Sequence, residues 1–280
     1  MKDLRDLTTH FRFGKNWESY ARIVDRTRVD QAVLGLERLL PDGESLAGKR
    51  FLDIGSGSGL SSVAALQCGA SSVVATDIDP QSIATTRALL ETWVPGDLWS
   101  VQKASVFELR SLNLGSFEVV YSWGVLHHTG DLRAALKAAS ELVAPNGFFV
   151  FSLYRKTRLC NFWKKEKRFY AKARPMTQKM IRAVYLVYFR LVFFLQGFNF
   201  KEYIDSYDRN RGMDFYHDVH DWLGGYPYES MSPRDVDQTL RRLGFLEIKS
   251  FCEKSGFGWL GSGCDEYTYQ RVQPTDMALD

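Results

Sequence analysis

Residues 51–60, Phe-Leu-Asp-Ile-Gly-Ser-Gly-Ser-Gly-Leu, constrain the fold more than any other stretch of this 280-residue chain. An apolar run ends there in three glycines spaced by serines, and residues 61–68 that follow have the composition of a helix. A strand, a glycine turn and a helix in this order let a ligand lie against bare backbone, near the N–H groups of the helix start. The segment therefore predicts a ligand site at this turn.

A second strand ends in Asp77 and Asp79, about twenty residues after the glycine turn. An acid at that place can accept hydrogen bonds from both hydroxyls of a ribose, so the two segments together predict a nucleoside site. Asp53, inside the first strand, would repel a pyrophosphate but suits a ligand with an ammonium and a sulfonium. A dinucleotide fingerprint would also place its third glycine at position 60, where this chain has Leu60.

Strand and helix signals alternate through the middle of the chain, which predicts a parallel sheet covered on both faces. The expected strands are 50–54, 72–76, 98–102, 118–122 and 147–153, with helices at 24–40, 60–68, 80–93 and 132–143. Residues 155–230 interrupt this alternation as an insert of helices that becomes irregular from 203 to 228. A helix beginning at Ser232-Pro233 and ending at Gly244 follows the insert, and strands 246–252 and 266–272 come last.

Positive charge is concentrated in the insert. Between Arg155 and Arg182 there are eleven Lys or Arg residues and one acid, Glu166, although the net charge of the chain is only +3. Two interpretations stay open, a solvated helical lid or a basic face for an anionic membrane or a phosphate-bearing acceptor. The next helix, 180–195, could bury its apolar side in lipid or in a partner subunit, so an oligomer stays open as well. No nucleic acid is expected, because no recognised binding module accompanies the charge.

The four cysteines, Cys68, Cys160, Cys252 and Cys264, have no zinc-like spacing and predict reduced thiols. Residues 1–6 are charged, unlike a signal peptide, and the longest apolar run, 183–195, is too short to span a bilayer. We therefore expect a cytoplasmic protein, with peripheral contact at the inner membrane face as an alternative.

The motifs resemble, nearly end to end, class I S-adenosylmethionine-dependent methyltransferases related to the ubiquinone-biosynthesis O-methyltransferase group. The matching segments are 13–17 (Phe-Gly-Lys-Asn-Trp), 51–59, 121–130 (Tyr-Ser-Trp-Gly-Val-Leu-His-His-Thr-Gly) and 222–227 (Trp-Leu-Gly-Gly-Tyr-Pro). The resemblance implies an α/β, Rossmann-like fold with a seven-stranded, mostly parallel sheet, an antiparallel last strand and a helical insert after the fifth strand. It also divides the chain into an N-terminal helical lid segment (1–50), a cofactor-binding core (51–154), an insert holding the acceptor pocket (155–231) and a closing helix and hairpin (232–280).

S-adenosyl-L-methionine is the cofactor that this resemblance implies. Asp53 would hold its amino group directly or through water, Asp77 its ribose, and Ser105 replaces the acid that many relatives use for the adenine. The full set of expected cofactor-binding residues is Lys15, Trp17, Asp53, Gly55, Ser56, Gly57, Gly59, Asp77, Ile78, Ser105, Val106, Ser122 and Trp123. By analogy, Phe13, Lys15 and Trp17 fold over the cofactor as a lid.

Two adjacent histidines, His127 and His128, follow the fourth predicted strand, where a loop crosses the ligand crevice of an open sheet. A histidine is suited to take a proton from a hydroxyl near neutral pH, and we favour His128 over His127 as the catalytic base. A role in orienting the loop is the alternative for both.

The acceptor is expected to be a small hydroxylated molecule that is methylated on oxygen. We expect its pocket to be formed by Tyr216, His217, His220, Trp222 and Tyr226, whose rings would line a flat or sugar-like molecule. A metal half-site at His217 and His220 is disfavoured, and no metal is predicted. Methylation of nitrogen or carbon, non-methylating use of the sulfonium, and an inactive cofactor-binding tether are the alternatives.

Overall fold

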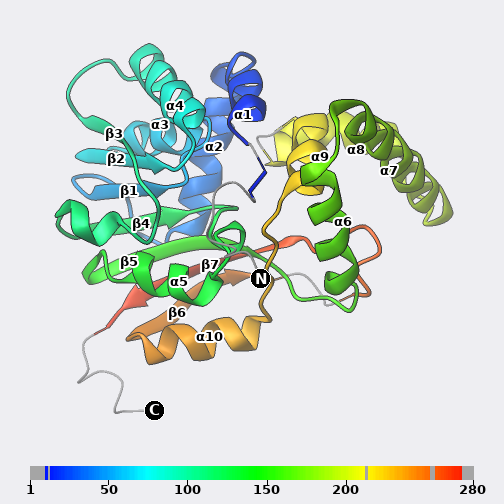
Figure 1. Ribbon diagram of the computed structural model, residues 1–280. Coiled ribbons are helices and arrows are strands. Elements are labelled where there is room, and N and C mark those ends of the chain that lie inside the picture. Colours follow the sequence, from blue (N-terminus) through cyan, green and yellow to red (C-terminus); the bar gives the residue numbers. More distant parts are fainter. Residues whose placement is uncertain (1–9, 12, 212–213, 253–255, 273–280) are drawn as a thin grey trace.

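A computed structural model gives the structure of the chain and describes residues 10–11, 13–211, 214–252 and 256–272. Its centre is one seven-stranded sheet in the order β3-β2-β1-β4-β5-β7-β6 (Figure 1). The strands are β1 (Arg50–Ile54), β2 (Ser72–Asp77), β3 (Trp99–Lys103), β4 (Phe117–Ser122), β5 (Val143–Tyr154), β6 (Phe245–Phe251) and β7 (Cys264–Arg271). The first five strands pair in parallel, whereas β7 runs antiparallel to both neighbours, β5 and β6. The predicted fold class is confirmed.

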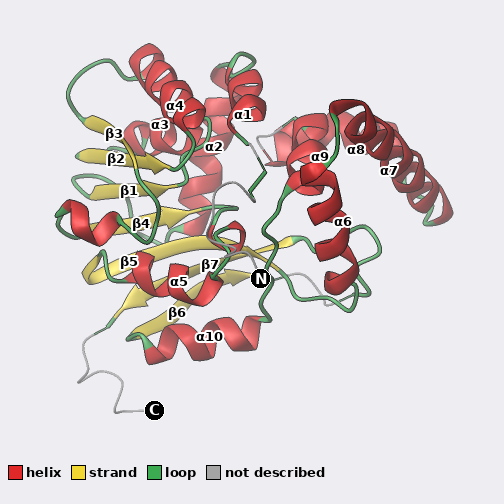
Figure 2. Cartoon of the chain, viewed as in Figure 1, coloured by secondary structure: helices red, strands yellow, loops and turns green. Residues whose placement is uncertain are grey.

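Helices cover both faces of this sheet (Figure 2). One face carries α2 (Arg26–Leu39), α3 (Leu60–Gln67) and α4 (Pro80–Trp93), and α1 (Gly14–Ala21) packs on α4. The other face carries α5 (Leu132–Ser140) and α10 (Pro233–Arg242). Four helices between β5 and α10 form a separate layer beside the sheet: α6 (Cys160–Lys172), α7 (Pro175–Leu195), α8 (Phe200–Arg211) and α9 (Phe215–Gly224).

Side-chain caps fix where several helices begin. Asp79 accepts the backbone N–H of Gln81 at the start of α4, and Asp131 and Asp214 cap α5 and α9 in the same way. Ser232 caps α10, and Pro233 occupies the first turn, where its missing N–H costs no hydrogen bond. These signals explain why the predicted starts of α4, α5 and α10 agree with the structure.

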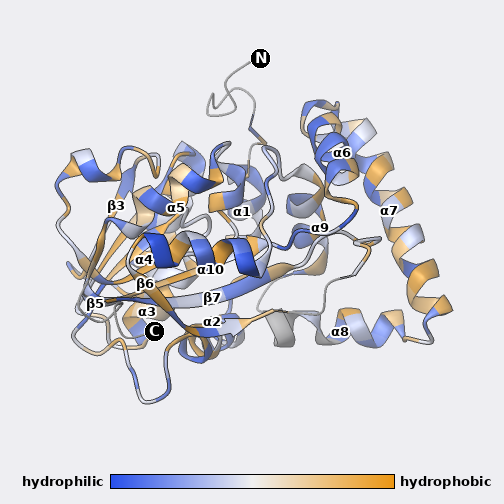
Figure 3. Cartoon of the chain, turned by 90° about the horizontal axis from the view of Figure 1, so that it is seen from below, coloured by the Kyte–Doolittle hydropathy of each residue, from blue (hydrophilic) through white to orange (hydrophobic). Residues whose placement is uncertain are grey.

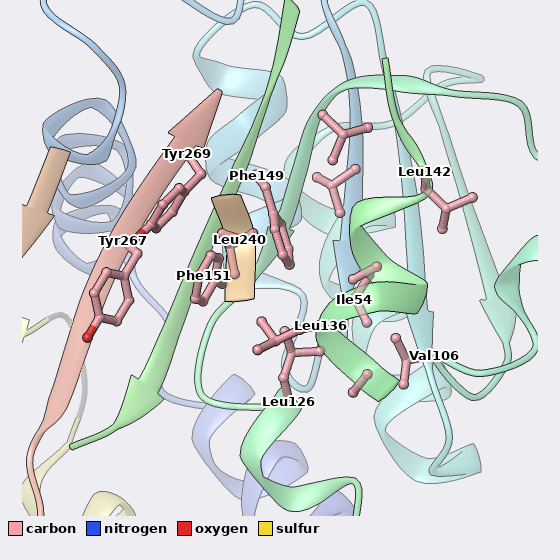
Figure 4. Close-up of a cluster of buried hydrophobic side chains, with 14 of the residues drawn as sticks. Ile54, Val106, Leu126, Leu136, Leu142, Phe149, Phe151, Leu240, Tyr267 and Tyr269 are labelled. Carbon is pink, nitrogen blue, oxygen red and sulfur yellow. The ribbon is translucent and has the colours of Figure 1, made fainter. Parts of the chain in front are cut away.

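The largest hydrophobic cluster lies between the sheet and α5 and α10 (Figure 4). Phe149 and Phe151 of β5 contact each other with ring centroids 4.5 Å apart, and Phe151 stacks on Tyr267 of β7 at 5.3 Å. Leu136 of α5 and Leu240 of α10 are fully buried in the same cluster. This packing stabilises the strand ends on which the adjacent loops depend.

Three predicted boundaries differ from the structure. The helix expected to reach Val143 ends at Ser140, because Val143 already pairs with Phe117 of β4 and begins β5. The segment 203–228, expected to be irregular, is largely helical as the end of α8 and the whole of α9. The strand expected at 147–153 is longer, because β5 already begins at Val143.

Candidate active site

A cavity of about 680 Å³ lies at the carboxyl ends of β1, β2, β3 and β4. The chain order of the sheet reverses between β1 and β4, and this is the point where open α/β sheets bind ligands. Loops after these strands, together with residues of α1, form the half of the wall that holds the residues predicted to bind a nucleoside (the nucleoside half). Residues of α7, α8 and α9 form the other half. The cavity thus joins the glycine turn predicted to bind a nucleoside to the helices of the insert.

The glycine turn brings bare backbone to the cavity. Gly55 lines it with φ of 77°, and a Cβ atom there would lie 2.4 Å from Val125 Cγ2. Gly57 also has positive φ, its backbone N–H donates to Asp77 over 3.0 Å, and a Cβ atom would lie 3.1 Å from the Trp17 ring. Only glycine fits both positions without displacing a neighbour.

Asp77 lies at the carboxyl end of β2, with its two oxygens held by backbone. Oδ2 accepts the Gly57 N–H, and Oδ1 accepts the Asp79 N–H over 2.9 Å. Burial raises the pKa of the Asp77 carboxyl to about 6. Each oxygen keeps a further lone pair, so the side chain can also accept two ligand hydroxyls.

Six other predicted cofactor residues line the same half of the cavity: Lys15, Trp17, Ile78, Ser105, Val106 and Trp123. The Ser105 Oγ accepts the Phe107 N–H over 3.4 Å, which leaves its hydroxyl proton available to a ligand. The lid residues Phe13, Lys15 and Trp17 lie here because Asn16, between them, donates to Asp221 of α9 over 2.7 Å.

The cavity wall lacks five of the predicted cofactor residues: Asp53, Ser56, Gly57, Gly59 and Ser122. Asp53 is buried behind the turn, where its Oδ2 accepts the Ser62 hydroxyl over 2.6 Å, and it does not line the cavity. Ser56 bonds Thr86 of α4, Gly59 packs against the Thr86 backbone, and Ser122 donates to the Ile54 carbonyl. The structure therefore corrects the prediction that Asp53 contacts the cofactor directly. Contact through water stays a prediction.

His127 and His128 both line the cavity and hold opposite tautomers. The Nδ1 of His128 lies 2.7 Å from the Pro227 carbonyl oxygen, so it carries the proton and leaves a lone pair on Nε2. The Nδ1 of His127 accepts the Tyr154 backbone N–H over 3.3 Å, which places the proton of that ring on Nε2. Burial is the main cause that lowers the pKa of His128 to about 3 and that of His127 well below its usual value.

The structure corrects most of the predicted acceptor pocket. Of the five expected residues only Trp222 lines the cavity, because α9 turns Asp218, Val219 and Trp222 inward at helical spacing. The other four lie elsewhere: Tyr216 is 52% exposed, His217 bonds Asp214 and Ser19, His220 bonds Tyr170 and Arg182, and Tyr226 is buried behind the helix end. Among the described residues no cluster of His, Cys, Asp and Glu could hold a metal ion.

Aromatic rings from the insert form the other half of the cavity, where the acceptor pocket was expected. They are Tyr185 and Phe189 of α7, Tyr203 and Tyr207 of α8, and Phe215 and Trp222 of α9, with Tyr154 at the end of β5. Two acids lie among these rings, Asp218 and Asp221. Asp218 accepts the Tyr207 hydroxyl. The apolar spacing of Phe215, Val219 and Trp222 could have revealed this inner face of α9 from the sequence.

Asp221 is the buried acid of this half. Its Oδ1 accepts the Asn16 amide, whereas Oδ2 has no hydrogen-bond partner among the described residues. Burial raises the pKa of Asp221 well above its usual value. Among the described residues, Lys15 and Lys103 are the Lys and Arg side chains that line the cavity.

Sheet topology, glycine turn and Asp77 together define a Rossmann-like nucleoside-binding protein of the methyltransferase type. Residues 24–245 match the family model described as a methyltransferase domain, and the chain belongs to this family of class I S-adenosylmethionine-dependent methyltransferases. S-adenosylmethionine is the cofactor of the family, and Gly55 and Asp77, which were expected to bind it, both line the cavity.

Curated relatives match part of the chain. A ubiquinone biosynthesis O-methyltransferase of Xanthomonas oryzae is 36% identical over 113 residues, and one of Aromatoleum aromaticum is 33% identical over 107 residues. These segments are 40% and 38% of this chain and 46% and 44% of the relatives, so the chain spans less than half of their length.

Solved structures share the fold across most of the chain. The magnesium protoporphyrin IX methyltransferase of Synechocystis, with bound S-adenosylhomocysteine, has a TM-score of 0.51 and 17% identity, covering 87% of this chain and 82% of its own. The N-methyltransferase NodS of Bradyrhizobium japonicum, in complex with the same product, has a TM-score of 0.50 and 13% identity, covering 94% and 100%. At these identities the likeness shows the fold alone.

Proposed function

We propose that the chain transfers a methyl group from S-adenosylmethionine to an oxygen of a small hydroxylated acceptor, with His128 as the general base. The observation that carries this proposal is the hydrogen bond between His128 Nδ1 and the Pro227 carbonyl, because it fixes the lone pair of the imidazole on Nε2. Gly55, Gly57 and Asp77 would hold the cofactor, and Trp17 would cover it.

The tautomers favour His128 over its neighbour. His127 has its Nδ1 lone pair engaged by Tyr154 and its Nε2 protonated, so it can donate but not accept at the cavity. The lowered pKa keeps His128 neutral at physiological pH, as a base must be before the reaction. Gly225 packs directly behind this ring, where a Cβ atom would lie 2.5 Å from His128 Cε1, and so fixes its position.

When bound, S-adenosylmethionine supplies a methyl carbon attached to a sulfonium and leaves as S-adenosylhomocysteine. The chain's own task is to hold the acceptor hydroxyl in line with that carbon and to receive its proton. The proton becomes strongly acidic as the oxygen–carbon bond forms, so neutral His128 can take it on Nε2 despite a low resting pKa.

The wall of the acceptor half supports an acceptor with a flat, largely apolar body. Rings of Tyr185, Phe189 and Trp222 can stack on such a body, and Asp218 with Asp221 can accept from its hydroxyls. Relatives of similar fold include carbon and nitrogen methyltransferases, and these reactions are the second candidates.

The test uses purified full-length protein, S-adenosylmethionine with a labelled methyl group, and a panel of hydroxylated aromatic acceptors. We expect His128→Gln to lower kcat by roughly 10²–10⁴-fold with an oxygen acceptor. Its affinity for S-adenosylmethionine in calorimetry should stay near the wild-type value. His217→Gln is the matched control, because His217 lies outside the cavity and should leave kcat unchanged.

Each alternative has a distinct outcome. Wild-type turnover by His128→Gln on an amine or carbon acceptor would favour nitrogen or carbon methylation without a base. Methylthioadenosine in place of S-adenosylhomocysteine would show non-methylating use of the sulfonium. Binding of S-adenosylmethionine without any product from the acceptor panel would favour an inactive cofactor-binding protein.

A further inference from the structure

Helix α7 has an apolar face that packs on nothing else in the described chain. Its exposed residues recur every three or four positions, so they lie on one side of the helix and continue past its end. This outer stripe consists of Met176, Met180, Val184, Val187, Leu191, Phe194, Leu195 and Phe198, which are between 53% and 78% exposed. Monomeric soluble proteins rarely expose so continuous an apolar surface without a binding role.

The outer stripe is distinct from the core-facing side of the same helix. Tyr185 and Phe189 are buried and line the cavity, and Tyr185 donates to the Leu260 carbonyl over 2.9 Å. Figure 3 shows α7 at the outer edge of the molecule, beside α6 and α8 and away from the sheet. Packing within the chain therefore accounts for one face of α7 and leaves the other exposed.

The charge around the stripe has a single sign. From Lys167 to Lys201 the sequence has eight Lys or Arg residues and no Asp or Glu. Six of them are exposed: Arg168, Lys172, Arg174, Lys179, Arg190 and Lys201. Lys167, expected on the basic surface, is instead buried, with its ammonium 3.5 Å from the centre of the Trp222 ring.

This positive charge distinguishes between two possible occupants of the apolar face, a second copy of the chain and a lipid bilayer. A second copy pairing through α7 would bring Lys179 and Arg190 of both chains together with no acid on either helix to compensate. An anionic bilayer supplies both hydrocarbon for the stripe and negative headgroups for its basic flanks. No helix among the described residues is long and apolar enough to cross a membrane, so α7 would lie along the interface.

We infer that the outer stripe of α7 docks the protein on the surface of an anionic phospholipid bilayer, with the flanking Lys and Arg residues at the headgroups. The docking surface lies mainly on the helix expected at 180–195, for which lipid and a partner subunit were both open, and less on the basic segment 155–182. Its α6 end is extended by Phe162 and Phe169, which are 57% and 62% exposed.

The experiment is sedimentation of the full-length protein with vesicles of phosphatidylcholine alone or mixed with phosphatidylglycerol. We expect binding to the mixed vesicles only, weakening as salt rises because the headgroup attraction is screened. The variant Val187→Gln, Leu191→Gln and Phe194→Gln should weaken the partition coefficient by ~10-fold or more, since three apolar side chains no longer enter the interface.

The matched control replaces three exposed apolar residues elsewhere, Leu34→Gln, Leu98→Gln and Ile248→Gln, and should bind vesicles like the wild type. Calorimetric binding of S-adenosylmethionine verifies that each variant is folded and keeps this test separate from the methyltransferase proposal. Absence of wild-type binding to mixed vesicles at low salt, or equal loss in the control, overturns the inference. A wild-type dimer in light scattering that the stripe variant converts to monomer, without vesicle binding, would identify a second copy as the occupant.

Discussion

Two adjacent side chains of the same type, His127 and His128, receive different chemistry from the backbone around them. A backbone N–H donates to one Nδ1, whereas a backbone carbonyl accepts from the other. Both partners come from segments distant in sequence, Tyr154 at the end of β5 and Pro227 after α9. The assignment of the base therefore depends on where the insert returns to the sheet.

Asp53 leads to a prediction about pH. Burial raises its pKa to about 7, against 3.8 in the unfolded chain, so the folded state holds a proton that the unfolded state releases between these values. Stability contributed by this group is present below about pH 4 and lost as pH rises toward 7. The difference in Tm between Asp53→Asn and the wild type should therefore rise in favour of the variant from about pH 4 to 7. Above about pH 7 this difference should stay constant.

Thermal unfolding of both proteins at a series of pH values measures this difference. Asp97→Asn serves as the control, because Asp97 is exposed and its substitution should give no such window. A Tm difference for Asp53→Asn that stays constant from pH 4 to 7 would contradict the raised pKa.

At the scale of elements, α1 depends on tertiary contacts. A helix of eight residues is not stable alone in water. Asp79 accepts the Gly14 N–H over 3.2 Å at its start, and Asn16 donates to the His217 carbonyl and to Asp221 of α9. These hydrogen bonds hold the segment that carries Lys15 and Trp17 against both Asp79, which follows β2, and helix α9 of the insert.

We expect Asn16→Ala to lower the free energy of unfolding by ~1–3 kcal/mol, because it leaves the buried Asp221 Oδ1 without a donor. Affinity for S-adenosylmethionine should fall as well, since Trp17 loses its fixed position. Urea unfolding and calorimetry measure the two effects. Arg22→Ala, which removes only an exposed ion pair with Glu18, is the control and should change stability by less than ~1 kcal/mol. Equal changes of stability and of S-adenosylmethionine affinity in the two variants would contradict the role of Asn16 in positioning α1.

At the scale of the whole molecule, a buried ion pair links the start of the insert to the sheet. Arg155 follows β5 and pairs with Asp265 of β7, and both side chains are buried. A backbone hydrogen bond adds to this link, since the Arg155 N–H donates to the Gly263 carbonyl over 2.9 Å. The position of the whole helical layer therefore depends on this point of the sheet.

Arg155→Met should destabilise the protein by ~3–5 kcal/mol, because it leaves the buried Asp265 carboxylate without its positively charged partner. Adding Asp265→Leu to that variant should recover part of the loss, since the unpaired charge is then removed. Urea unfolding measures both. Arg110→Met, at an exposed pair with Glu141, should cost less than ~1 kcal/mol. A double variant no more stable than the single one would show that packing, not charge, holds the junction.

Local patterns were sufficient for the sheet and for the nucleoside half of the cavity. Glycines at 55 and 57 and the acid at 77 act through backbone geometry within two consecutive strand–turn–helix units, so their positions follow from nearby sequence. Asp53 is one of five predicted residues that do not line the cavity, because its partner Ser62 lies on α3 and turns the carboxylate away.

The sequence by itself determined the alternation of strands and helices and the places of the two candidate histidines, since each depends on periodicity or spacing that is local in the chain. The resemblance of its motifs to a known family implied the cofactor. Only the tertiary structure decided the tautomers of His127 and His128. It alone showed that Lys167 is buried while the outer stripe of α7 is exposed. These features depend on how the insert packs against the sheet, and contacts between residues far apart in sequence leave no periodic signal from which to predict them.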